Sequence, residues 1–179
     1  MENIEIILRN MHITEIESVL TESILFNIKD IKTSHFFDKE KNKDISYHEV
    51  GDLKKYFLNP GTCSIFLEKA MVGAEFENVL LLIASDGQSG DITINLEESR
   101  LMKESNQAID KKVQKLLALL LGIYQKDVVK EVILGYEPAD DDDMMILRVA
   151  RKQIEMLNKN AFDSQWACSV YNLAKHMKL

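Results

Sequence analysis

Four consecutive aspartates are the residues of this sequence whose type and spacing come closest to a catalytic motif. Asp140, Asp141, Asp142 and Asp143 follow a short apolar segment, and carboxylates are preferred ligands of hard divalent cations. A metal-binding aspartate motif places its acids one helical turn apart, but methionines occupy those later positions. Because consecutive side chains point in different directions, four adjacent aspartates do not converge on one ion. The run therefore favours a solvated charged loop or a partner-binding patch over a metal site.

A second acidic segment has the glycines of a ligand-binding loop. Asp86, Gly87, Gly90 and Asp91 match fragments of calcium and phosphate loops. The late bidentate Glu of a calcium loop and the Lys of a phosphate loop are both missing. This segment therefore predicts a hairpin turn.

The cysteines and histidines form no recognisable site. Cys63 and Cys168 lie far apart without a companion at metal-ligand spacing, so we expect reduced core thiols. The four histidines are scattered along the chain, and no serine or cysteine lies in a nucleophile elbow. The sequence predicts no cofactor, no metal and no catalytic residues, and hence a protein that is not an enzyme.

The net charge is concentrated in two segments. The chain has 22 Lys and Arg against 29 Asp and Glu, a formal charge of −7. Residues 131–143 and residues 86–98 contain acids and no base. Such a surface repels the phosphates of nucleic acids and anionic lipids, and attracts a basic protein. We therefore expect a protein partner, and neither nucleic acid nor a membrane.

The N-terminal segment indicates a cytoplasmic protein. Glu2 and Glu5 stand where a signal peptide carries basic residues, and the apolar run at 6–8 is too short for an export core. The longest other apolar run, 116–123, falls short of the roughly 20 residues that a membrane span needs.

Apolar periodicity predicts an α+β fold. In the first half of the chain we expect helices at 14–26 and 48–57, an exposed connection at 35–44, and strands at 62–68, 75–84 and 92–96. In the second half we expect a helix at 107–124, strands at 131–136 and 144–149, a helix at 151–159, and a last helix capped by Asp163. A helical start at 144–149 stays open. The pattern predicts a single domain, residues 1–179, with a small antiparallel sheet in the middle of the chain packed with N-terminal and C-terminal helices.

Two stretches resemble small bacterial immunity proteins, the cytosolic antitoxins of contact-dependent and other polymorphic toxin systems. The first is LLLIASDG (80–87) leading into GDITINLEE (90–98), and the second is VILGYEPA (132–139) leading into the aspartates. The resemblance implies a partner, a cognate toxin that is a basic nuclease domain, whose active site the acidic surface would block. The expected contact residues are Glu97, Glu98, Glu137, Asp140, Asp141, Asp142 and Asp143.

Two other functions remain open from the sequence. One is a metal-dependent hydrolase that uses the acidic loops with a divalent cation. The other is a non-catalytic adaptor that binds a partner through the C-terminal helices, where Trp166 heads an apolar stripe.

Overall fold

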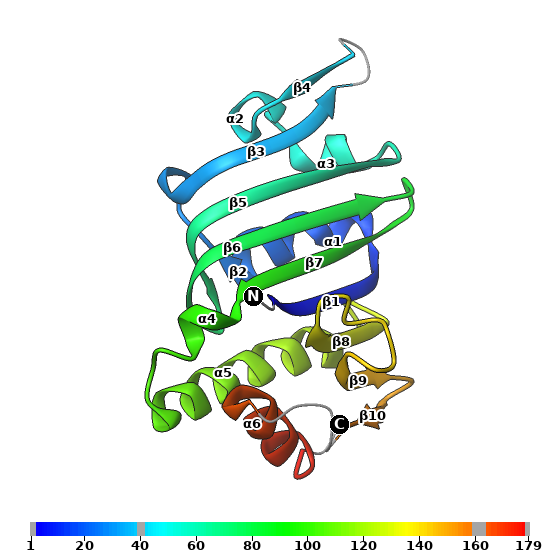
Figure 1. Cartoon of the computed structure of the whole chain (residues 1–179). Helices are drawn as coiled ribbons and strands as arrows, with labels where there is room; N and C mark the ends of the chain where they lie inside the picture. Colours follow the sequence, from blue (N-terminus) through cyan, green and yellow to red (C-terminus); the bar gives the residue numbers. More distant parts are fainter. Residues whose placement is uncertain (1–2, 39–41, 159–163, 178–179) are drawn as a thin grey trace.

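The computed structural model describes residues 3–38, 42–158 and 164–177. Within these residues ten strands form one sheet in the order β10-β9-β8-β1-β7-β6-β5-β3-β4, with β2 beside β5, and the paired strands run antiparallel (Figure 1). The strands are β1 (Asn3–His12), β2 (Ile24–Leu25), β3 (Ile31–Asp38), β4 (Lys43–Ile45), β5 (Gly61–Val72), β6 (Ala74–Ser85), β7 (Ser89–Glu97), β8 (Glu131–Tyr136), β9 (Met145–Ala150) and β10 (Gln153–Leu157).

Six α-helices accompany the sheet in the described part of the chain. They are α1 (Ile13–Ser18), α2 (Tyr47–Val50), α3 (Leu53–Phe57), α4 (Glu98–Leu101), α5 (Asn106–Gln125) and α6 (Gln165–Ala174), with a π-helical turn at Val19–Ser23 and a 3-10 turn at Ile28–Asp30. None of the helices in the described ranges is long and apolar enough to cross a membrane.

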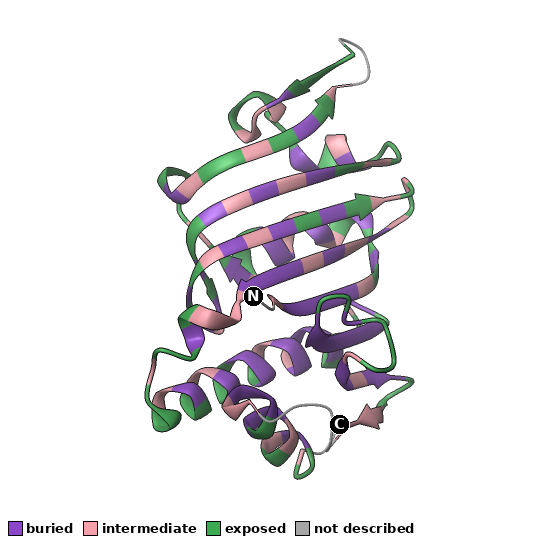
Figure 2. Cartoon of the chain, viewed as in Figure 1, coloured by how far each residue is buried: buried purple, intermediate pink, exposed green. Residues whose placement is uncertain are grey.

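The helices cover one face of the sheet. In β1, Ile4, Ile6 and Leu8 are buried in the main core, whereas Glu5 and Arg9 point to the opposite side, as the period of two in a strand requires. Helices α1 and α5 contact the strands from the core side, and α6 packs on α5 and β9. Figure 1 shows α1 behind β6 and β7. We call the opposite side of β1 and β3–β9, which none of the described helices covers, the open face. Figure 2 shows that exposed and half-buried residues alternate with buried ones along β5 and β6, whereas β8 is buried throughout.

The predicted small sheet in the middle of the chain is wrong in size and position. The sheet begins at Asn3, and β1 lies between β7 and β8. The alternation of polar and apolar residues in β1 is interrupted at Ile7. This side chain lies on the open face, yet it is apolar and buried under the loop that follows β8. An uninterrupted apolar run in a central strand carries no period of two.

Residues 35–44 and 151–159 were expected to be a connection and a helix, and both predictions are wrong. Residues 35–38 and 43–44 belong to the edge hairpin β3–β4, where polar and charged side chains are usual because they protect the exposed edge. In the second segment Arg151 and Lys152 adopt φ of 49° and 61° and turn the chain from β9 into β10. Two consecutive residues with positive φ form a tight hairpin turn. Such turns usually contain Asn or Gly, and Arg and Lys occupy these positions here, so the turn was not recognised. Residues 39–41 of the first segment and residue 159 of the second lie outside the described residues.

The two expected N-terminal helices are shorter than predicted. The first ends its α-helical part at Ser18 and gives way to β2 at Ile24. The second is divided into α2 and α3 by Gly51, whose φ of 71° is left-handed and ends a helix. Each half has its own N-cap, Ser46 for α2 and Asp52 for α3.

The strands and helix of the central segment are confirmed. Strands β5, β6 and β7 contain the predicted strands, and α5 contains the predicted helix. Asp86 forms the predicted turn, since its Oδ1 accepts hydrogen bonds from the backbone N–H groups of Gln88 and Ser89 at 2.8 and 2.7 Å. Strands β8 and β9 flank the aspartates, so the strand alternative for 144–149 is confirmed. The expected cap Asp163 lies outside the described residues, and Ser164 occupies the N-cap of α6.

Candidate functional site

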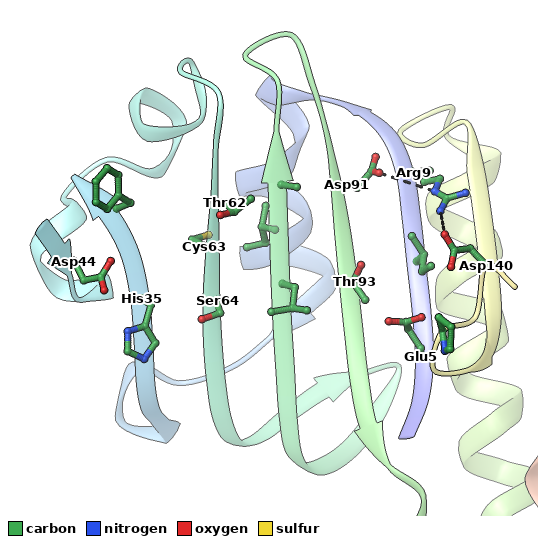
Figure 3. A pocket seen from close by; sticks show the side chains of 16 residues that line it. Glu5, Arg9, His35, Asp44, Thr62, Cys63, Ser64, Asp91, Thr93 and Asp140 are labelled. Atoms are coloured by element: carbon green, nitrogen blue, oxygen red, sulfur yellow. Dashed lines mark hydrogen bonds and ion pairs between the residues drawn. The ribbon is translucent and has the colours of Figure 1, made fainter. Parts of the chain in front are cut away.

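The open face is hollowed between β4 and the loop that follows β8. A cavity of about 580 Å³ spans β4, β3, β5, β6, β7 and β1. Figure 3 shows Asp44 and His35 on one side of this cavity and Arg9, Asp91 and Asp140 on the other, with Thr62 and Ser64 between them. A concave sheet face that no helix covers offers a surface for a folded partner.

Apolar side chains are exposed within this cavity. Leu82 on β6 is 39% exposed and Phe37 on β3 is 43% exposed. Protein interfaces commonly combine such apolar anchors with a polar rim. The open face has this composition.

The acidic loop, residues 137–143, lies over β1 and forms one wall of the cavity. Ala139 is fully buried and packs in a small second cluster with Ile7, Ile133 and Met145 on the open side of the sheet. The backbone N–H of Ala139 donates to Oε2 of Glu5 at 2.6 Å. The loop is therefore attached to the strand beneath it, and the aspartates that follow are held beside the cavity.

Arg9 is surrounded by carboxylates at this wall. Its guanidinium lies 2.6 Å from Asp140, 3.5 Å from Glu131 and 4.0 Å from Asp91. Glu131 is also paired with Arg148 on β9. Among the described charged side chains that lie on or border the open face, carboxylates are in the majority. The acids include Glu5, Asp44, Asp91, Glu97, Glu131, Glu137 and Asp140, and the cations include Arg9, Lys32, Arg100 and Arg148.

The acidic loop and the end of β7 carry six of the seven expected contact residues. Glu137 accepts a hydrogen bond from Nδ2 of Asn3 at 2.8 Å, and Glu97 pairs with Asn3 in the β1–β7 register, so these two acids flank one residue. Hydrogen bonds from Ser99 and Asn78 lower the pKa of Glu97. Asp140 is paired with Arg9, whereas Asp141, Asp142 and Asp143 are exposed. Their role in binding stays a prediction.

Glu98, the seventh expected contact residue, takes part in an internal cluster. Its Oε1 accepts hydrogen bonds from the Tyr136 hydroxyl at 2.6 Å and from Nε1 of Trp166 at 2.9 Å. The Tyr136 and Trp166 rings pack edge to face with centroids 5.2 Å apart. Burial raises the pKa of Tyr136, with a further contribution from Glu98. This carboxylate joins α4, β8 and α6 and is positioned for stability.

Sequence reasoning missed the open-face residues Glu5, Arg9, Phe37 and Leu82. Glu5 was used only as evidence against a signal peptide, and the two apolar residues have no signal that distinguishes them from core residues. The alternation of Asn3, Glu5 and Arg9 with apolar residues could have indicated a strand with one polar face. Only the sheet order shows that this polar face adjoins the acidic loop.

Side chains that could act as metal ligands or nucleophiles line the cavity, among them His35, Cys63 and Ser64. Across residues 3–38, 42–158 and 164–177, no group of three or more His, Cys, Asp or Glu side chains could hold a metal ion. Cys63 is buried under the cavity, and burial raises its pKa to about 12, so its thiol stays protonated at neutral pH. Cys168 was expected in the core and is exposed instead.

The apolar stripe of α6, which the adaptor hypothesis would use, is turned inward. Trp166 and Val170 are buried in the main core, and Leu173 and Met177 pack against it. The helix therefore serves the fold through this stripe.

Two comparisons identify related proteins, and a third, with curated proteins, found no match. The chain aligns over 89% of its length, and over 98% of the other chain, with a chain from the crystal structure of the toxic C-terminal tip of CdiA from Pseudomonas aeruginosa in complex with immune protein. The TM-score is 0.57 and the identity 18%, so this likeness concerns the fold. The model of the PABL017 Cdi1I immunity protein family matches residues 2–152, which is most of the chain. The protein thus belongs to the PABL017 Cdi1I immunity protein family.

Proposed function

We propose that this protein neutralises a cognate CdiA-type toxin tip by binding it through the open face and the acidic loop. The family membership supports toxin binding. The observation that carries the choice of surface is the acidic loop fixed over β1, which sets a wall of carboxylates beside a cavity with exposed apolar side chains. Such a face is complementary to a cationic protein with an apolar contact region.

The proposed mechanism is occlusion without chemistry. The toxin is a basic nuclease domain, and the carboxylates of the open face take the place of nucleic-acid phosphates in its active-site cleft. The complex is one-to-one and buries roughly 1,200–2,000 Å² of total surface, the size of an ordinary specific interface. Long-range attraction between opposite charges speeds association and weakens as salt is added.

Neutralisation is tested with a cognate toxin tip, which is sought in the reading frames adjacent to this gene. Co-expression of the wild-type protein is expected to restore growth of cells that produce the toxin. The purified complex is expected to leave RNA and DNA intact under conditions in which the free toxin cleaves them. Failure of the purified proteins to associate contradicts the proposed function, whereas association without loss of cleavage contradicts active-site occlusion.

The role of the acidic loop is tested with a neutral variant and a control of equal charge change. Changing residues 141–143 together to Asn removes three exposed carboxylates and leaves the Arg9–Asp140 pair in place. We expect the dissociation constant to rise at least tenfold at low salt and much less at high salt. The control changes Glu15 and Glu17 in α1, together with Glu22 in the π-helical turn that follows, to Gln; these elements lie on the side of the sheet opposite the open face. Equal losses in both variants would indicate a general charge effect, and an unchanged affinity of the loop variant would exclude this loop.

A further inference from the structure

An unpaired buried acceptor lies on the open face. Asn95 on β7 lies between Ile94 and Leu96, whose side chains enter the main core, so the Asn95 side chain points to the open side. Asn95 is only 6% exposed, and within the described part of the chain no hydrogen-bond donor reaches its Oδ1. A buried acceptor without a donor destabilises the free protein. Its presence is explained if a donor arrives with a ligand.

The neighbour of Asn95 across the strand pair is also an acceptor. Glu5 is the Cα partner of Asn95 in the β1–β7 register, so their side chains are adjacent on the open face. Oε2 of Glu5 accepts the hydrogen bond from the N–H of Ala139. Burial raises the pKa of Glu5, and the nearby charges of Glu137 and Asp140 add to the rise, against the hydrogen bond from Ala139 and the single cation Arg9. The pair thus combines an amide oxygen without a donor and an incompletely compensated carboxylate.

The pair borders a cavity. Asn95 lines a hollow of about 550 Å³ together with Leu80, Phe66 and Glu97. This hollow shares His35 and Ser64 with the 580 Å³ cavity in which Glu5 lies, so the two are continuous along the open face. A long side chain from a partner that enters this hollow lies beside the pair, and it reaches Oδ1 of Asn95, which is covered in the free protein, when the neighbouring side chains change rotamer.

We propose that the toxin inserts one Lys or Arg side chain into this hollow and donates hydrogen bonds to Oδ1 of Asn95 and to the carboxylate of Glu5. Ammonium and guanidinium groups have several donors and no acceptor, which matches a site made of acceptors. Their charge opposes that of Glu5 and of the neighbouring Glu97, and their apolar stem would pack on Leu80 and Phe66. The inference rests on the proposed function and adds to it the anchor that the open face receives.

Titration calorimetry with the toxin tip tests the anchor in two variants. Glu5→Gln keeps an oxygen for the Ala139 N–H and removes the charge, and Asn95→Leu removes the acceptor at similar volume. We expect each to raise the dissociation constant about tenfold or more, and the double variant to lose less than the product because both act on one side chain. Asn172→Leu makes the same exchange at an exposed position of α6, away from the open face, and is the matched control that is expected to bind like the wild type.

The outcomes separate this inference from the proposed function. If the wild type binds and both variants bind equally well, the anchor is wrong and the proposed function stands. If Glu5→Gln binds more tightly, the hollow receives an apolar group and the cationic anchor is excluded. If the wild type does not bind the toxin tip, the proposed function itself fails. Circular dichroism checks folding, and Asn95→Ala replaces Asn95→Leu if the larger side chain prevents folding.

Discussion

Replacement of Glu98 by Ala separates stability from binding at a residue for which the sequence predicted toxin contact. Glu98 accepts hydrogen bonds from Tyr136 and Trp166, two of the largest fully buried side chains. The substitution removes the acceptor of both donors. It is therefore expected to weaken the junction of α4, β8 and α6 and to leave the open face unchanged.

The size of the effect follows from the bonds that are lost and those that remain. A hydrogen bond to a charged group contributes about 1.5–3 kcal/mol. After the change, Nε1 of Trp166 keeps the Tyr136 hydroxyl at 3.0 Å, and that hydroxyl keeps Oγ of Ser164 at 2.7 Å. We therefore expect a loss of about 2–4 kcal/mol, less than the full sum of two bonds. For a domain of this length, a loss in that range lowers the melting midpoint by roughly 10 °C.

Urea and thermal unfolding of Glu98→Ala measure this loss, and calorimetry with the toxin tip measures binding at a temperature at which the variant is folded. Glu98→Gln, which retains one acceptor oxygen, is expected to lose about half as much stability. Asp142→Asn, an exposed change in the acidic loop, is the control and is expected to stay within about 0.5 kcal/mol of the wild type. The reasoning is refuted if Glu98→Ala unfolds like the wild type and binds the toxin more weakly.

Three further predictions concern other parts of the fold. Gly73→Ala is expected to destabilise the protein by at least about 2 kcal/mol in urea unfolding. Gly73 has a φ of 73°, and a Cβ at this position would lie 2.4 Å from the backbone oxygen of Lys115. If the variant and the wild type had equal urea midpoints, the close approach of the β5–β6 turn to α5 would be contradicted. A thiol reagent is expected to modify Cys168 rapidly and Cys63 only after unfolding, since burial raises the pKa of Cys63 to about 12; fast modification of both thiols would show an open core. Burial raises the pKa of Glu5, so the folded protein loses stability when this carboxyl ionises as the pH rises through that pKa. Glu5→Gln is therefore expected to raise the melting midpoint at pH 7 by more than at pH 4. A melting midpoint of the variant below that of the wild type at pH 7 would contradict this sign.

The sequence was sufficient for elements with a clear period and failed where neighbouring strands determine the structure. The stripe of α5 and the alternation of β7 depend on local patterning, and both were predicted. Strand β1 was missed because the apolar Ile7 interrupts the alternation of Asn3, Glu5 and Arg9 with apolar residues. Strand β3 was missed because it belongs to an edge hairpin, whose polar and charged residues lack the expected alternation.

The candidate site was predictable in its charge and not in its geometry. The aspartates at 140–143 indicated an acidic loop between two strands, which the structure contains. Glu98 could not be distinguished from Glu97, since its partner Trp166 is far away in the sequence. Asn95 gave no signal because an unpaired acceptor is a property of three-dimensional packing.

The claim that the open face binds the toxin is tested most directly by two matched substitutions of exposed leucines. Leu82 lies in the cavity of the open face and is 39% exposed, whereas Leu58 follows α3, outside that cavity, and is 54% exposed. In calorimetry with the toxin tip, Leu82→Arg is expected to weaken binding at least a hundredfold, because it puts a bulky cation where a cationic protein docks, and Leu58→Arg is expected to bind like the wild type. Wild-type affinity for Leu82→Arg together with lost affinity for Leu58→Arg would place the toxin on another surface and contradict the account.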